Sequence, residues 1–165
     1  MIIKNAKVFM DEIGCFENLD IRVVGGKIAE VAEKIEVGSE EVIDAKNCFV
    51  TPGIIEAHSH IGMYEEGNQW EGDDICENEP VTPEMRSIDA IFPGDMAFDD
   101  ALTGGVTTMC TGFGSGGVVA GSAVIVENNG SLIADEIVIV PDAGMKCAFG
   151  ENPRDFGRKG KQPNP

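Results

Sequence analysis

The sequence predicts an α/β protein that begins with a small all-β unit. Two observations support this fold class. Residues 1–50 contain short β-branched runs between turn residues, and no segment there has helical periodicity with capping residues. From residue 54 the pattern changes to strand, loop, helix and strand, which is the order that opens a βαβ unit in a parallel sheet.

The first unit is expected to contain strands only. The run MIIKNAKVF alternates, and LDIRVVGGKIAEVAEKI holds two strand-like runs around Gly25-Gly26, a two-residue hairpin signal. EEVIDAKNCFVTPG adds two shorter runs, and its Pro52-Gly53 marks a boundary. We therefore expect a first domain over residues 1–51.

The next segment, IIEAHSHI, is mostly apolar and predicts one strand. Two helix starts are expected after it, with Thr82 and Asp95 near the first residues and prolines beside them. The second helix has a short apolar stripe and is expected to end at Gly104-Gly105. The stripe comprises Met96, Ala97, Ala101 and Leu102. VTTMC is then predicted as a strand.

The rest of residues 52–152 is again rich in β-branched residues. VVAGSAVIVE and SLIADEIVIV flank Asn129-Gly130, so we expect a β-hairpin insertion with its turn there. From Pro153 onward the sequence has no apolar period, and residues 153–165 are expected to form a loop or flexible tail.

Composition and charge exclude several classes of protein. The formal net charge of -17 argues against nucleic-acid binding, and no apolar run is long enough to predict a membrane span. The first residues do not resemble a signal peptide. Five cysteines without a CxxC pair fit free thiols in a reducing cytoplasm, so we expect a cytoplasmic protein.

Two histidines, His58 and His60, lie two positions apart in the predicted strand and are the only histidines of the chain. Alternate strand residues share a face, so the two imidazoles can converge on one cation such as zinc. HxH alone is also common in surface and structural positions. Twelve acids against one base, Arg86, follow in residues 61–100, and they fit either a solvated loop and helix face or a cation-attracting rim.

Four segments in order resemble the amidohydrolase superfamily: IIKNAKVF, DIRVVGGKIAEVAEKI, VIDAKNCFVTPGIIEAHSH and ALTGGVTTMCTG. GMKCAFGENPR is similar to the branch related to imidazolonepropionase. The resemblance implies an N-terminal β-sandwich part followed by the first strands of an incomplete (β/α)8 TIM-type barrel. Residues 52–152 would then be a partial metal-dependent hydrolase barrel.

The resemblance also implies an activity: hydrolysis of a C–N bond in a small-molecule amide or cyclic amide, with one or two divalent metals, zinc first among them. His58 and His60 match the two family histidines that bind the metal, while Glu56 stands where the motif more often has Asp. The family adds a carboxylated lysine or glutamate, two histidines and an aspartate from later strands.

This sequence has no histidine after His60, and a full barrel takes about 250 residues. We therefore expect the N-terminal portion of an amidohydrolase. Alone it would be inactive, and it would depend on the missing C-terminal portion or on a homo-oligomer.

Other functions stay open at this point. GFGSGG fits G-x-G-x-x-G, with Asp135 about twenty residues on, as in a nucleotide-binding module, but β-branched residues follow where a helix is required. A non-catalytic fragment or interaction scaffold is the other alternative. Cys110 is expected to be a buried small hydrophobe rather than a nucleophile or ligand. Tyr64 and Trp70 fit either a substrate pocket or loop packing.

Overall fold

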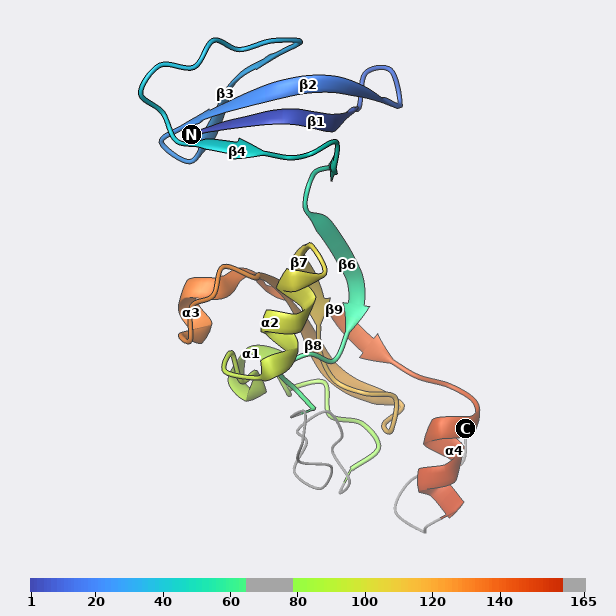
Figure 1. The fold of residues 1–165 in the computed structure, drawn as a ribbon. Coiled ribbons are helices and arrows are strands. Elements are labelled where there is room, and N and C mark those ends of the chain that lie inside the picture. The colour runs from blue at the N-terminus through green and yellow to red at the C-terminus, as the bar shows by residue number, and fades with distance from the viewer. Residues whose placement is uncertain (65–78, 159–165) are drawn as a thin grey trace. The chain divides into compact units, whose positions relative to one another are not determined.

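A computed structural model describes the backbone of residues 1–64 and 79–158, and side chains of these up to Arg154. The chain divides into two units, Met1–Pro52 and Gly53–Pro165. Each is described by itself below (Figure 1). In the described ranges, no helix is long and apolar enough to cross a membrane.

The first unit is a five-stranded sheet, as the short β-branched runs predict. Its order is β3-β2-β1-β4, with β5 also beside β1. The strands are β1 (Ile2–Met10), β2 (Cys15–Val24), β3 (Lys27–Ala32), β4 (Val42–Asp44) and β5 (Phe49–Val50). Gly25 and Gly26 have φ values of 57° and 75° and form the predicted turn between β2 and β3. The sandwich to which this sheet was assigned stays a prediction.

Asp20 joins the segment after β3 to this sheet. It is buried, its Oδ1 accepts from the Asn5 backbone at 3.1 Å, and its Oδ2 accepts from the Ile35 backbone at 2.9 Å. Lys4 Nζ lies 2.7 Å from Oδ2. Burial raises the pKa of the Asp20 carboxyl, but the hydrogen bonds from Lys4, Ile35 and Asn5 outweigh burial and hold the pKa below its usual value.

The second unit is a four-stranded sheet in the order β6-β7-β8-β9. Its strands are β6 (Ile54–Ser59), β7 (Val106–Thr111), β8 (Val119–Glu127) and β9 (Val138–Cys147). β6 and β7 are parallel, while β7–β8 and β8–β9 are antiparallel. β9 therefore runs in the same direction as β6 and β7, and all three strands have their carboxyl ends at one edge.

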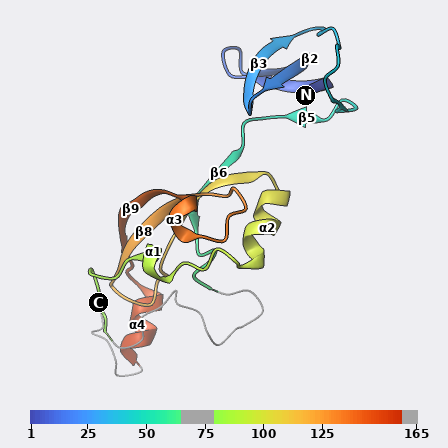
Figure 2. The same cartoon turned by 90° about the vertical axis from the view of Figure 1, so that its left-hand side faces the viewer.

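Three helices cover one side of this sheet, α1 (Ser87–Ala90), α2 (Met96–Thr103) and α3 (Ala134–Ile137) (Figures 1 and 2). Phe98 of α2 and Ile137 of α3 join one buried cluster with Met109 of β7. Val124 and Val126 of β8 belong to the same cluster. This core holds β7 in the middle of the sheet, next to β6.

The start and end of α2 follow the predicted signals. The Asp95 side chain accepts from the Ala97 backbone, and the helix ends at Gly104-Gly105, where Gly105 has a φ of 89°. The predicted stripe was wrong in part. Met96 is 68% exposed, while Phe98, outside the stripe, is 5% exposed. The aromatic ring buries more apolar area against the sheet, so it sets the face that the helix presents.

The other expected helix does not begin at Thr82. The Thr82 hydroxyl donates to the Val119 and Ala120 carbonyls at 3.3 and 3.4 Å. The helix, α1, begins at Ser87 instead. Val81 and Arg86 form bridges with β8. These contacts keep the chain extended where the capping pattern predicts a helix.

The predicted hairpin exists as β8 and β9, but its second arm differs. Residues 134–137 form α3, and β9 begins at Val138 and continues past Pro141. The apolar face of α3 is drawn into the core through Ile137. A proline is tolerated in β9 because the strand stands at the end of the described sheet order and pairs with β8 alone among the described strands.

The sequence predicts a loop or flexible tail from residue 153, and the structure differs there. Residues 151–158 form α4 (Glu151–Arg158). Pro153 falls in its first turn, where a helix has no internal partner for a backbone N–H, so the proline does not disrupt it. Residues 159–165 lie outside the described part of the chain.

Candidate metal site

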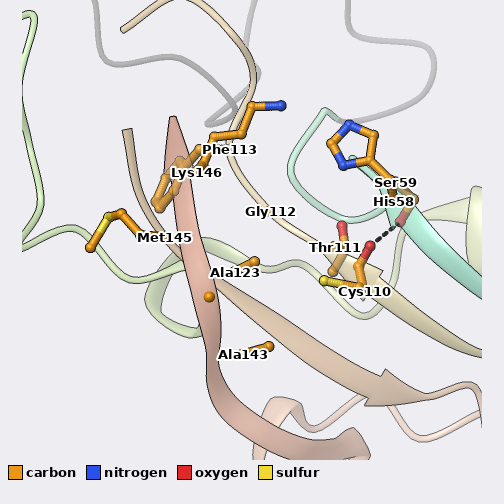
Figure 3. Close-up of a pocket in the computed structure, with 11 residues that line it drawn as sticks. His58, Ser59, Cys110, Thr111, Gly112, Phe113, Ala123, Ala143, Met145 and Lys146 are labelled. Carbon is orange, nitrogen blue, oxygen red and sulfur yellow. Dashed lines mark hydrogen bonds between the residues drawn. The ribbon is translucent and has the colours of Figure 1, made fainter. Parts of the chain in front are cut away.

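Hydrogen bonds join the carboxyl ends of β6 and β7. The Ser59 hydroxyl donates to the Cys110 carbonyl at 3.2 Å, drawn as a dashed line in Figure 3. The Gly112 N–H donates to the Ser59 carbonyl at 3.3 Å. In parallel sheets covered by helices, sites are built at this edge because loops from neighbouring strands meet there.

The chain turns sharply after β6, so His60, which was predicted to lie within this strand, falls just beyond its end. β6 ends at Ser59, and the His60 carbonyl accepts from Met63 and Tyr64 at 3.0 and 3.2 Å. Gly62 has a φ of 77°, which an L side chain rarely adopts. The Thr111 hydroxyl donates to the Ile61 carbonyl at 2.7 Å. The turn is therefore tied to the end of β7.

The His60 ring has a defined hydrogen-bond partner. Its Nδ1 lies 2.6 Å from the carbonyl oxygen of Gly112. A carbonyl oxygen only accepts, so Nδ1 carries the proton in this contact. The lone pair of a neutral ring is then on Nε2, which leaves that nitrogen able to bind a metal. Metal-binding histidines commonly have such a partner for the second nitrogen.

His58 brings a second imidazole to the same place. The ring centroids of His58 and His60 are 5.1 Å apart, with an angle of 83° between ring planes. Two imidazoles that bind one tetrahedral zinc ion through bonds of about 2.1 Å have centroids about 5 Å apart. The separation therefore fits a shared metal ion. His58 is exposed and His60 is half-buried.

Glu56 does not add a ligand in this arrangement. Its Oε1 accepts from the backbone N–H of His58 at 3.0 Å. The carboxylate thus faces its own strand. Among residues 1–64 and 79–154, no group of three or more His, Cys, Asp or Glu side chains is placed to hold a metal ion. The described part of the chain therefore offers two imidazoles.

A cavity of about 180 Å³ opens beside His58 (Figure 3). Cys110 and Ala123 contribute to its wall, together with Met145 and Lys146 near the end of β9. Cys110 is half-buried, so it is less enclosed than the predicted buried small hydrophobe. Lys146 was not singled out from the sequence. It lies within GMKCAFGENPR, and no local pattern shows that the end of β9 lines the same cavity as the end of β7.

A second hollow lies beside His60 and is lined by Tyr64, Ile61 and Ala97. Tyr64 is exposed, so its ring is available to a ligand in this hollow. Trp70 lies outside the described residues. Half of the twelve acids of residues 61–100 also lie outside the described residues, so the cation-attracting rim stays a prediction.

The glycines of GFGSGG have a different role from the nucleotide motif. The chain enters β8 at Val119, two residues after the last of these glycines, so a strand stands where the motif requires a helix. A dinucleotide fingerprint needs a helix N-terminus to face the phosphates. That prerequisite is missing, and the carbonyl of the first glycine, Gly112, is the partner of His60.

No family model matches the chain. Its fold matches a crystal structure of an amidohydrolase from Thermotoga maritima, with a TM-score of 0.86 and 37% identity over 98% of this chain and 42% of that chain. The chain belongs to the amidohydrolase superfamily. It corresponds to the N-terminal portion of such a protein, so this resemblance is confirmed.

Curated relatives agree with this placement of the amidohydrolase chain. The amidohydrolase tasK of Hapsidospora irregularis is 32% identical over 81% of this chain and 15% of its own length. A dihydroorotase of Elusimicrobium minutum is 34% identical over 66% of this chain and 20% of its own length. An allantoinase of Salmonella choleraesuis is 41% identical over 44% of this chain and 15% of its own length. The chain thus spans a fifth or less of these relatives. The closer placement beside imidazolonepropionase stays a prediction.

Proposed function

We propose that this chain supplies the first metal ligands of a hydrolase that cleaves a C–N bond in a small amide or cyclic amide. His58 and His60 would hold a divalent ion, zinc by preference, and the complete site would hold one or two ions. Such an ion supplies a water of lowered pKa and polarises the amide carbonyl.

The observation that carries this proposal is the contact between His60 Nδ1 and the Gly112 carbonyl. It fixes the ring in the tautomer that leaves Nε2 free to bind a metal, and the carbonyl that does so directly follows the neighbouring strand β7. A surface histidine without function has no need of such a partner. The His58 ring stands at a separation that fits a shared ion.

The names of the relatives support the reaction class. They include an amidohydrolase, a dihydroorotase and an allantoinase. What those proteins act on belongs to them, and the substrate of this chain is part of the proposal.

We also infer that the second unit is the opening of a TIM-type barrel. The support is the parallel pairing of β6 and β7, with α2 between them in sequence. Ile55 of β6 is 73% exposed, which suits a strand whose surface is covered in a larger assembly. Later barrel strands or a second copy would then complete the ligand set. The chain alone would not turn over substrate.

Zinc titration of the purified chain tests the metal site. We expect binding by calorimetry, weakened at least tenfold by His58→Ala or His60→Ala, since each change removes one of two imidazoles. Ring ¹⁵N NMR is well suited because the chain has only two histidines. It should show a proton on Nδ1 of His60 before zinc is added and a shift of Nε2 afterwards.

Cys110→Ser is the matched control, because it removes a thiol from the neighbouring cavity without removing an imidazole. It should leave the zinc affinity unchanged. Zinc binding that survives both histidine variants would contradict the proposal. Turnover of hydantoin or N-acetylglycine by the isolated chain would contradict its dependence on further ligands.

A further inference from the structure

A hydrogen bond within β6 joins the Glu56 side chain to the backbone of His58, where Oε1 accepts from the N–H at 3.0 Å. We propose that Glu56 is a positioning residue, which fixes the backbone at His58 and so keeps the His58 ring beside the His60 ring. The inference deepens the proposed function and rests on it for the metal ion that the two rings would share. The positioning itself can be measured without a metal.

The pairing of β6 with β7 is irregular at this point. Glu56 pairs with Met109 and Ser59 pairs with Thr111, so three steps along β6 correspond to two steps along β7. One extra residue therefore lies in β6 between Glu56 and Ser59, as in a β-bulge. A bulge interrupts the ladder of hydrogen bonds between two strands and changes the direction in which a side chain points. His58 lies in this irregular stretch.

The Glu56 carboxylate supplies an acceptor within the irregular stretch. A backbone N–H that leaves the ladder needs another acceptor, and an ionised carboxylate makes stronger hydrogen bonds than a neutral oxygen. Asp and Asn side chains commonly accept from the N–H two residues further along the chain. Glu56 makes the same kind of contact through one more methylene group, so a glutamate can serve where the family motif more often has Asp.

The two rings are held in different ways. The His60 ring is fixed from the end of β7, because its Nδ1 donates to the Gly112 carbonyl. His58 is exposed on β6, and the Glu56 contact acts on its backbone. The ring centroids lie 5.1 Å apart. A shift of the backbone at His58 would change this separation, and bonds to zinc of about 2.0–2.1 Å leave little room for such a change.

Two substitutions separate positioning from a direct effect of the carboxylate on a cation. Glu56→Gln removes the charge but keeps a side-chain oxygen that can accept from the His58 N–H. Glu56→Ala removes both the charge and the acceptor. The difference between the two variants therefore reports the hydrogen bond, whereas a carboxylate that acted as a ligand or through its charge would be lost equally in both.

NMR of the full 165-residue chain in chelator-treated buffer tests the positioning without a metal. The chain has two histidines, so their ring signals are readily assigned. We expect a nuclear Overhauser contact between the His58 and His60 rings in the native chain and in Glu56→Gln, and its loss in Glu56→Ala. Backbone spectra verify the fold of each variant. A ring contact that is absent from the native chain, survives Glu56→Ala or is lost in both variants would overturn the inference.

Calorimetric zinc titration measures the consequence for the metal site. Glu56→Ala should bind zinc about three- to tenfold more weakly than Glu56→Gln, which is the effect of one hydrogen bond. Glu127→Ala is the matched control, since it removes an exposed glutamate that pairs with Thr108 in the same sheet, away from the carboxyl end of β7. It should bind zinc like the native chain. Equal affinities of Glu56→Ala and Glu56→Gln would refute the role of the hydrogen bond.

The metal-free measurement separates this inference from the proposed function. A chain that binds zinc through the histidines and keeps the ring contact in Glu56→Ala refutes the role of Glu56 alone. A chain whose ring contact depends on Glu56 but which does not bind zinc refutes the metal site alone.

Discussion

Asp95 connects the start of α2 to the turn that carries His60. Its Oδ1 accepts from the Ala97 backbone at 3.0 Å, and its Oδ2 accepts from the Gly62 backbone at 3.1 Å. The side chain is buried. One carboxylate thus satisfies a helix N-terminus and positions the site loop.

Asp95→Ala should lower the free energy of unfolding of the second unit by about 1–3 kcal/mol, because it leaves two N–H groups without their acceptor. Urea unfolding followed by NMR signals of β7 and β8 measures this. Asp100→Ala removes an exposed carboxylate from the same helix and should change the free energy by about 0.5 kcal/mol or less. Equal effects of the two variants would show that Asp95 has no special role.

Gly62→Ala should weaken zinc binding as well as stability. A Cβ at this position would lie 2.9 Å from side-chain atoms of Ile91 and Phe98, and φ is 77°. The turn has to shift, and His60 shifts with it. Calorimetric zinc titration and thermal unfolding measure the two effects.

Gly130→Ala separates backbone strain from this clash. Its φ is 81°, but a Cβ there would meet nothing within 4 Å. It should cost about 1–2 kcal/mol from the left-handed conformation alone and leave zinc affinity unchanged. If both glycine variants bound zinc like the native chain, the turn would not be what positions His60.

The lowered pKa of Asp20 predicts that the first unit loses stability in acid. Its pKa is lowered in the folded state from an ordinary value of 3.8, so the unfolded chain binds the proton more readily. Stability from this group is therefore fully present above about pH 5 and is lost as pH falls through 3.8 toward the folded pKa. Asp20→Asn should remove this part of the pH dependence.

Urea unfolding at pH 3 to 6, followed by amide signals of β1 and β2, tests that expectation. Asp11→Asn is the control, since Asp11 is exposed in the turn between these strands. A pH dependence that is the same in both variants would assign the acid sensitivity to other carboxyl groups.

Met109 and Met96 form a matched pair for the core of the second unit. Met109 is fully buried in β7, whereas Met96 is exposed at the start of α2. Met109→Ala should cost about 2–5 kcal/mol and Met96→Ala about 0.5 kcal/mol or less. Denaturant unfolding measures both losses of free energy. A larger loss at Met96 than at Met109 would favour the predicted apolar stripe as the buried face of α2.

The sequence predicts those features that depend on neighbouring residues. The turn at Gly25-Gly26 and the cap at Asp95 follow from local backbone preferences, and the structure has both. The family resemblance also came from contiguous segments. Phe98 was missed because a short helix leaves more than one apolar face possible until the sheet beneath it is known.

The candidate site shows the same limit more sharply. HxH marks two imidazoles, but the partner of His60 lies 52 positions away at Gly112. A backbone carbonyl has no signature in the sequence. Lys146 likewise reaches the cavity only through the pairing of β8 with β9, and α3 altered the register that an Asn-Gly hairpin would have produced.

The bond between His60 and Gly112 has a consequence for motion. The contact links the orientation of the imidazole to the pairing of the ends of β6 and β7, because Gly112 also donates its N–H to the Ser59 carbonyl. Local opening of the strand ends, which amide hydrogen exchange at Gly112 reports, would release this constraint on the ring.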